Sequence, residues 1–226
     1  VHPHEEVYPA FAQAMGIDPE SRSPVPFRIA DRDYVRHYFE MLHHPMEEEG
    51  VDFWWMDWQQ GEISEVRGLD PLPWINHLHF NEIKRRGVRP MLYSRWGGLG
   101  NHRYYIGFSG DTYVTWDALR FQPYMTATAA NVLYGWWSHD IGGHMGGATE
   151  PELYARWVQA GALSPVLRLH STKDARAERR PWGYVEPVYQ AAKAAFLLRY
   201  ALIPYLYSSA RRVADTGVAL CKPMYY

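Results

Sequence analysis

The apolar residues of the chain follow two alternating periods, one typical of strands and one of helices. Compact apolar runs predict buried strands at 51–56, 88–93, 132–137 and 165–169. A further strand is expected to lead into Phe108. Apolar residues at helical spacing predict helices at 31–50, 71–86, 115–130 and 150–161, and a long one from the end of a charged loop (171–185) to about Val213. The Pro-rich residues 1–30 are expected to form a loop, and residues 218–226 a strand.

Alternation of this kind predicts an α/β fold with a parallel sheet. No GxGxxG sequence follows a predicted strand and no Walker-type loop is present, so a nucleotide-binding fold is unsupported. Five polar residues lie at or just beyond the carboxyl ends of successive predicted strands: Asp57, Arg95, Asp111, Asp140 and His170. In a β/α barrel these ends share one face, and that face holds the active site.

Composition narrows the choice of partners. The chain has 226 residues and a formal net charge of -2, so neither nucleic acid nor an anionic membrane surface is expected to bind it. No apolar run is long enough to suggest a membrane-spanning helix, and the lone Cys221 excludes an internal disulfide. The first residue is Val1, so we expect a piece of a longer protein, and we leave compartment and oligomeric state open.

Two of the strand-end residues are carboxylates that could cleave a glycosidic bond. A retaining glycosidase needs two carboxyl groups roughly 5–5.5 Å apart, one as nucleophile and one as acid/base. Asp57 lies among tryptophans that could bind a sugar ring, and Asp111 follows a glycine that permits a tight bend. Taken singly, either aspartate could equally well be a residue that caps the next helix.

The remaining strand-end residues could bind sugar hydroxyls. Arg95 and Asp140 would form charged hydrogen bonds, although a surface cation and a helix cap explain them too. His139 and His170 could donate as well, but a histidine in this position is more often structural. Arg168 could point the opposite way along its strand from the site, or orient an active-site carboxylate.

At these residues the sequence resembles glycoside hydrolase family 31, the α-glucosidase and α-xylosidase family. The resemblance rests on Trp54-Trp55-Met56-Asp57, Ser109-Gly110-Asp111 with Thr115-Trp116, His139-Asp140-Ile141-Gly142-Gly143, Leu167-Arg168-Leu169-His170 and Pro204-Tyr205-Leu206-Tyr207. It implies that Asp57 is the nucleophile, that Asp111 is the acid/base, and that no metal or cofactor takes part. It also implies a partial (β/α)8 TIM barrel, about strands four to eight, over residues 1–217, and the start of a following β-domain at 218–226.

Three departures from the family pattern lie near the expected sugar and leaving group. Trp58 begins an unusual Trp-Gln-Gln sequence after the nucleophile, Phe108 stands where Trp is frequent, and His144 stands where Phe is frequent. Specificity is therefore expected to differ from that of ordinary α-glucosidases. The full set of expected substrate-binding residues is Arg95, Asp140, His170, Trp55, Trp58, Phe108, His139, Arg168 and His144.

The leading prediction is a retaining hydrolase that cleaves terminal α-linked, α-glucoside-like sugars of an oligosaccharide or other α-glycoside through a glycosyl-Asp intermediate. An α-transglycosylase or an α-glucan lyase would use the same residues. A zinc hydrolase could use His139, Asp140 and His144, or His2 and His4, but there is no HExxH sequence and no cysteine cluster. A non-catalytic sugar-binding protein is the remaining alternative.

Overall fold

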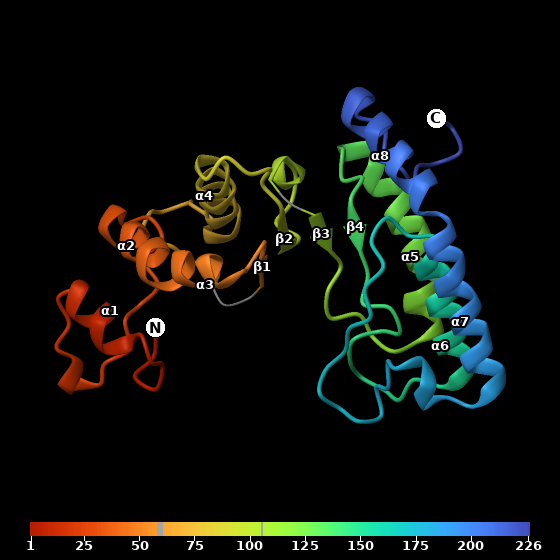
Figure 1. Cartoon of the computed structure of the whole chain (residues 1–226), viewed down its shortest axis with the longest axis horizontal. Coiled ribbons are helices and arrows are strands. Elements are labelled where there is room, and N and C mark those ends of the chain that lie inside the picture. The colour runs from red at the N-terminus through yellow and green to blue at the C-terminus, as the bar shows by residue number, and fades with distance from the viewer. Residues whose placement is uncertain (58–60, 105) are drawn as a thin grey trace. The chain divides into compact units, whose positions relative to one another are not determined.

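A computed structural model describes residues 1–57, 61–104 and 106–226. These residues form two compact units, 1–97 and 98–226 (Figure 1).

The first unit begins with a short helix, so the prediction of a loop at 1–30 was wrong. Helix α1 (Tyr8–Ala14) has a proline in its first turn, where no backbone N–H is needed, and a 3-10 turn, η1 (Pro19–Ser21), follows it. Phe11 is fully buried. The prolines were read as loop signals, although their positions suit helix starts.

The helical run predicted at 31–50 is confirmed, with one irregular turn. It consists of α2 (Arg32–His37), the π-helical η2 (Tyr38–His43) and α3 (His44–Glu49). The Asp31 carboxylate caps the run by accepting from the backbone N–H groups of Asp33 and Tyr34. Gly50 ends it with a φ of 121°, which suits glycine.

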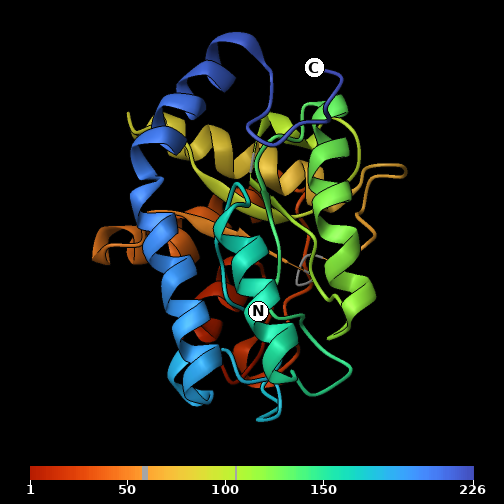
Figure 2. The same cartoon turned by 90° about the vertical axis from the view of Figure 1, so that its right-hand side faces the viewer.

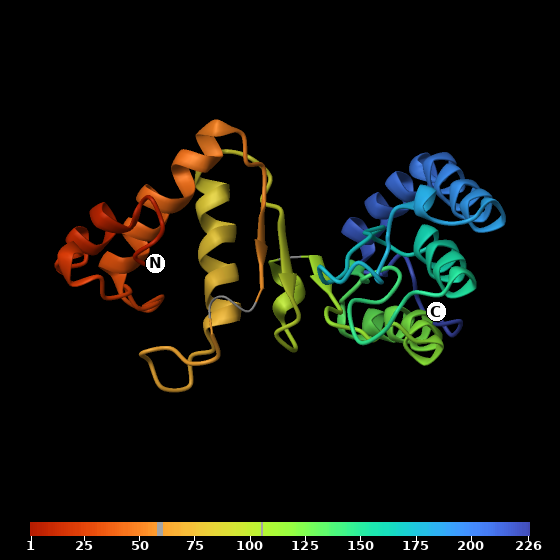
Figure 3. The same cartoon turned by 90° about the horizontal axis from the view of Figure 1, so that it is seen from below.

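A parallel strand–helix–strand unit completes the first unit. Strand β1 (Trp54–Met56), helix α4 (Pro71–Arg85) and strand β2 (Leu92–Arg95) follow one another, and Figure 3 shows α4 lying along the two strands. The strands pair in register, with Trp54 opposite Leu92 and Met56 opposite Ser94. Asn76 of α4 donates to the Ser94 hydroxyl at 2.9 Å and so ties the helix to β2. Both strands are shorter than predicted.

The second unit repeats the arrangement. The 3-10 turn η4 (Asn101–Arg103) leads to β3 (Ile106–Phe108), α5 (Trp116–Ala129), a 3-10 turn η5 (Ala130–Val132) and β4 (Trp137–Ser138). Strands β3 and β4 are parallel, with Phe108 opposite Ser138. Residues 165–169 were predicted to be a strand. They make only isolated parallel bridges, Ser138 to Val166 and Ile141 to Leu169, so that prediction was wrong.

Helices cover these strands. Figure 2 shows α5 together with α6 (Pro151–Ala162) and α7 (Glu186–Ala201); the 3-10 turn η6 (Pro181–Gly183) precedes α7. The core between them contains Ile141, Tyr154 and Trp157, each almost completely buried. Gly161 lies against Ile141 so closely that a Cβ there would come within 2.3 Å of the Ile141 Cδ1.

The C-terminal part differs from prediction twice. The single long helix is interrupted after α7, and α8 (Ile203–Thr216) starts anew with a proline in its first turn, because proline cannot supply the N–H that a continuous helix needs. Residues 218–226 form turns and no strand. The Asn131 amide donates to the Tyr225 hydroxyl at 2.7 Å and fixes this segment. No helix in the described ranges is long and apolar enough to cross a membrane.

Candidate active site

In the first unit, a short ion pair holds the expected nucleophile. Asp57 directly follows β1 and Arg95 is the last residue of β2, so parallel pairing brings the two side chains together. The Arg95 Nε donates to the Asp57 Oδ1 at 2.6 Å. The Arg95 side chain is only 3% exposed while that of Asp57 is 29% exposed, so the carboxylate reaches the surface and its cation lies behind it.

Aromatic side chains surround Asp57 in the same unit. Trp55 packs edge-on against Tyr93, and the Trp54 indole donates to the buried Glu47 carboxylate at 2.8 Å. A cavity of about 660 Å³ opens beside them, lined by Tyr38, Trp54, Trp55, Met56 and Asp57 among others. The predicted sugar-binding residue Trp58 falls outside the described residues.

In the second unit, Asp111 lies on a strained turn just beyond β3. Its φ is 40°, a left-handed conformation that a non-glycine residue seldom adopts, and Gly110 before it has a φ of 58°. The turn packs closely against a second loop, since a Cβ on Gly143 would come within 2.7 Å of the Val114 Cα. The backbone N–H of His144 donates to the Thr112 carbonyl at 2.7 Å and fixes the two loops together.

These loops assemble a chain of charged side chains. His144 lies between two carboxylates: its Nε2 is 3.4 Å from Asp111 Oδ1, and its Nδ1 is 3.2 Å from Asp140 Oδ2. Asp140 follows β4, is buried, and contacts Arg168 through its other oxygen. The His170 ring lies beside that of His144, with 5.0 Å between centroids. The structure thus brings five predicted side chains together, those of Asp111, Asp140, His144, Arg168 and His170.

Arg168 points toward the site and orients Asp140. Its Nε also donates to the Ser138 hydroxyl at 3.3 Å, and its guanidinium stacks 5.4 Å from the centre of the Phe108 ring. Of the two alternatives open from the sequence, orientation of a carboxylate is the one that this geometry supports.

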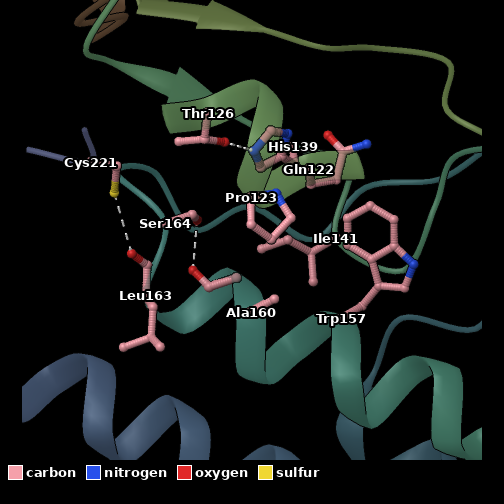
Figure 4. Close-up of a pocket in the computed structure, with 11 residues that line it drawn as sticks. Gln122, Pro123, Thr126, His139, Ile141, Trp157, Ala160, Leu163, Ser164 and Cys221 are labelled. Atoms are coloured by element: carbon pink, nitrogen blue, oxygen red, sulfur yellow. Dashed lines mark hydrogen bonds between the residues drawn. The ribbon is translucent and has the colours of Figure 1, made fainter. Parts of the chain in front are cut away.

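His139 points away from this cluster, as alternation along an extended segment requires. Its Nε2 contacts the Thr126 hydroxyl at 2.5 Å, and it lines an apolar cavity of about 400 Å³ between α5 and α6, together with Trp157 and Cys221 (Figure 4). Burial lowers the His139 pKa to about 4, so the ring is neutral at pH 7. Sugar binding by His139 stays a prediction, and these contacts favour a structural role.

Arg179 is a residue that the sequence did not single out. It is buried and donates to the Thr149 hydroxyl at 2.6 Å, to the His170 carbonyl at 3.3 Å and to the Gly143 carbonyl. It therefore holds the two loops that carry His144 and His170. The sequence contains three arginines between 176 and 180, and no pattern distinguishes this one from its exposed neighbours.

The three side chains Asp111, Asp140 and His144 are also the one group with metal-ligand chemistry in the described part of the chain, with ligand atoms within 4.8 Å of one another. Both ring nitrogens of His144 already face carboxylates, whereas a metal would need one nitrogen and the carboxylates to converge on a single point. The other zinc candidates, His2 and His4, are exposed and stack on each other at 5.7 Å.

Comparison with known protein families decides the classification. Residues 26–209 match the model of the glycosyl hydrolases family 31 TIM-barrel domain. The chain belongs to glycosyl hydrolase family 31. This confirms the fold class predicted from the strand-end pattern, and it identifies the chain as part of an O-glycosyl hydrolase family.

Relatives within family 31 are considerably longer than this chain. It is 33% identical over 146 residues to lysosomal alpha-glucosidase from Bos taurus, an alignment that covers 63% of this chain and 15% of that enzyme. It is 40% identical over 93 residues to 1,6-alpha-glucosyltransferase from Sporosarcina globispora, covering 39% of this chain and 7% of that protein.

A solved structure supports the family 31 fold. The cycloalternan-degrading enzyme from Trueperella pyogenes, in complex with a covalent intermediate, aligns with a TM-score of 0.75 at 24% identity. The alignment covers 88% of this chain and 30% of that chain.

Proposed function

We propose that this chain carries the catalytic residues of a retaining α-glycoside hydrolase that acts on terminal α-linked, α-glucoside-like sugars. The observation that carries the proposal is that both candidate carboxylates lie at the carboxyl ends of parallel strands in a family 31 barrel domain, Asp57 directly after β1 and Asp111 three residues beyond the end of β3. That is the end of the strands where barrel enzymes place their catalytic groups. The bovine relative is an alpha-glucosidase, which supports the substrate class.

In the proposed reaction, Asp57 attacks the anomeric carbon while the bond to the leaving oxygen breaks. The guanidinium of Arg95 donates to one oxygen of the Asp57 carboxylate and so orients the carboxylate. Asp111 protonates the leaving oxygen, and then takes a proton from the water that displaces Asp57 from the sugar. The covalent intermediate named for the Trueperella enzyme is consistent with this course.

The sugar itself would be held by the second unit. Asp140 and His170 offer hydrogen bonds to hydroxyls, and Asp140 keeps its orientation through Arg168. Phe108 is 1% exposed and lies under the Arg168 guanidinium, so its expected role in sugar binding would be indirect, whereas Trp55 of the first unit is 41% exposed and has a ring against which a pyranose can pack.

Trapping the intermediate tests the proposal. The protein that carries this chain is incubated with a 5-fluoro-α-glucosyl fluoride, digested, and sequenced by mass spectrometry. We expect one added sugar on the peptide that contains Asp57. A label on any other residue, or an inverted anomeric configuration in the first product, would contradict the assignment.

Transfer to a second sugar is the alternative function that a specific observation favours, because one relative is a glucosyltransferase. Product analysis with maltose separates the two: glucose alone indicates hydrolysis, and longer oligosaccharides indicate transfer. An unsaturated anhydro-sugar would indicate a lyase.

A further inference from the structure

The guanidinium of Arg179 is a buried cation whose hydrogen-bond acceptors are neutral oxygens. It donates to the Thr149 hydroxyl at 2.6 Å, to the His170 carbonyl at 3.3 Å and to the Gly143 carbonyl. The side-chain carboxylate of its neighbour Glu178 forms an ion pair with a different arginine. Burial lowers the pKa of Arg179, so this environment disfavours the cation. Because burying a charge without an ion-pair partner costs stability, fold stability alone does not account for this arginine.

The backbone of Arg179 is fixed to the core of the second unit. Its carbonyl accepts from the Tyr154 hydroxyl at 2.9 Å, and Tyr154 of α6 is fully buried. The Tyr184 ring stacks on that of Tyr154 with 4.1 Å between centroids, and its hydroxyl donates to the Glu178 carbonyl at 2.7 Å. The guanidinium therefore extends from a point that the packing around α6 holds in place.

Two glycines shape the loop after Asp140 around this side chain. A Cβ on Gly142 would come within 2.5 Å of the Arg179 Nε, so a larger residue there would displace the guanidinium. Gly143 supplies the carbonyl that accepts from Arg179. The φ angles of Gly142 and Gly143 are 102° and 81°, in the region that favours glycine. The 140–143 loop and Arg179 thus fit each other closely.

These hydrogen bonds join the two segments that carry the residues expected to bind the sugar. One acceptor is the carbonyl of His170 itself, and another, on Gly143, lies three residues beyond Asp140. On the basis of the proposed function, we propose that Arg179 is a positioning residue for sugar recognition, which fixes His170 relative to Asp140 so that both can bind hydroxyls of one sugar. Arg168 orients the Asp140 carboxylate, whereas Arg179 acts on the backbone. A planar guanidinium with several fixed donors can hold separate oxygens at once.

The test compares the wild-type protein with Arg179→Met, which removes the donors, and with Arg179→Lys, which keeps the charge and loses the planar geometry. The quantities measured are kcat and KM with a nitrophenyl α-glucoside, and the inhibition constant of free glucose. We expect KM and the inhibition constant to rise about tenfold in Arg179→Met and less in Arg179→Lys, because misplaced hydroxyl binders weaken sugar binding. A role in folding alone would instead reduce the active fraction, which lowers kcat and leaves KM and the inhibition constant unchanged.

A second substrate shows where in the site the substitution acts. Maltose presents the same terminal glucose as the nitrophenyl glucoside, but its leaving group depends more on a proton from the proposed acid Asp111. If Arg179 acts on sugar binding, the factor by which kcat/KM falls in Arg179→Met should be the same for both substrates. A larger loss with maltose would place the effect at Asp111 and would overturn the assignment to sugar recognition.

Arg176 supplies the matched control, because it lies in the same loop with a side chain that is 70% exposed and pairs with Asp174. Arg176→Met should keep the wild-type KM, and an equal rise in both methionine variants would overturn the proposal. An unchanged KM in folded Arg179→Met would do so too. If circular dichroism shows that Arg179→Met does not fold, Arg179→Lys carries the test, and an unchanged KM there is the contradicting result. Failure of wild type to trap sugar on Asp57 would instead refute the proposed function.

Discussion

At the scale of single residues, the Asp57–Arg95 pair shows how strand pairing positions the carboxylate proposed as the nucleophile. The cation is buried and fixed by β2, while the carboxylate is partly exposed, so the pair can act on a ligand without rearranging. Such a contact orients the carboxylate more than it stabilises the fold. Its removal is therefore expected to affect turnover more than folding.

Substitution of Arg95 tests this point. We expect Arg95→Ala to lower kcat/KM about 100-fold, because Asp57, the proposed nucleophile, would lose its orientation and with it most of its effective concentration. The kcat/KM of Arg95→Lys should lie between those of the wild type and Arg95→Ala, since lysine keeps the charge and loses the planar geometry. Steady-state kinetics with a nitrophenyl α-glucoside gives the values. Arg120→Ala, which breaks an exposed pair with Asp117, is the control, and equal activity of Arg95→Ala and this control would disprove the role.

Much of the candidate site could be predicted because its residues sit at strand ends. Asp57, Arg95, Asp111 and Asp140 follow apolar runs that a reader can find in the sequence, and parallel pairing then brings neighbours together. Arg179 could not be found in this way. Its role depends on how the 171–185 loop folds back against residues 143 and 149, and neither the periodicity nor the spacing of residues in the sequence predicts such a contact.

At the scale of elements, α6 is held against the strand layer by one close approach. Gly161 leaves no room for a side chain opposite Ile141. In an exposed helix, a glycine replaced by alanine usually stabilises by about 1 kcal/mol. At position 161 the same replacement should instead destabilise the fold.

We expect Gly161→Ala to lower the free energy of unfolding by roughly 1–3 kcal/mol, as overpacking does in other cores. Urea denaturation gives the value. Ile141→Val removes the Cδ1 atom that the new methyl would meet, so the double variant should recover part of the loss. As a control, Ala194→Gly at an exposed position of α7 measures the effect of helix propensity alone. If Gly161→Ala were more stable than wild type, the close approach to Ile141 would not restrict the side chain at position 161.

Helices and strands differed in how well the sequence predicted them. The helices at 71–86, 115–130 and 150–161 were confirmed because capping residues and periodic apolar faces are local signals. Strands came out shorter, and 165–169 and 218–226 were not strands at all. Whether an extended segment pairs depends on partners far away in the chain, which no local pattern reveals.

At the scale of the whole molecule, each compact unit contains buried neutral histidines. Burial lowers the pKa of His43 in the first unit and of His139 in the second to about 4. Unfolding exposes both rings to water, where a histidine titrates near 6.5. Between pH 6.5 and 4 the unfolded chain therefore binds more protons than the folded chain.

The free energy of unfolding should consequently be highest above pH 6.5. It should decrease as the pH falls toward 4, by on the order of 2–3 kcal/mol for each ring. Urea denaturation at pH 7, 5.5 and 4.5 would measure the decline. His139→Gln should show a shallower slope than wild type, and His4→Gln, at an exposed position, the same slope. A wild-type stability that does not change over this range would contradict the assignment of neutral buried rings.

The left-handed backbone at Asp111 has a practical consequence for anyone preparing a substrate-trapping sample. Asparagine and glycine accept a φ of 40° more readily than other residues, whereas alanine adds a Cβ without any side-chain group to bond the turn. Asp111→Asn should thus remove the proposed acid/base and keep the loop geometry, which the melting temperature would verify. Asp111→Ala would confound lost chemistry with a rearranged loop, and a crystal of that variant with bound oligosaccharide would misrepresent how the leaving group is held.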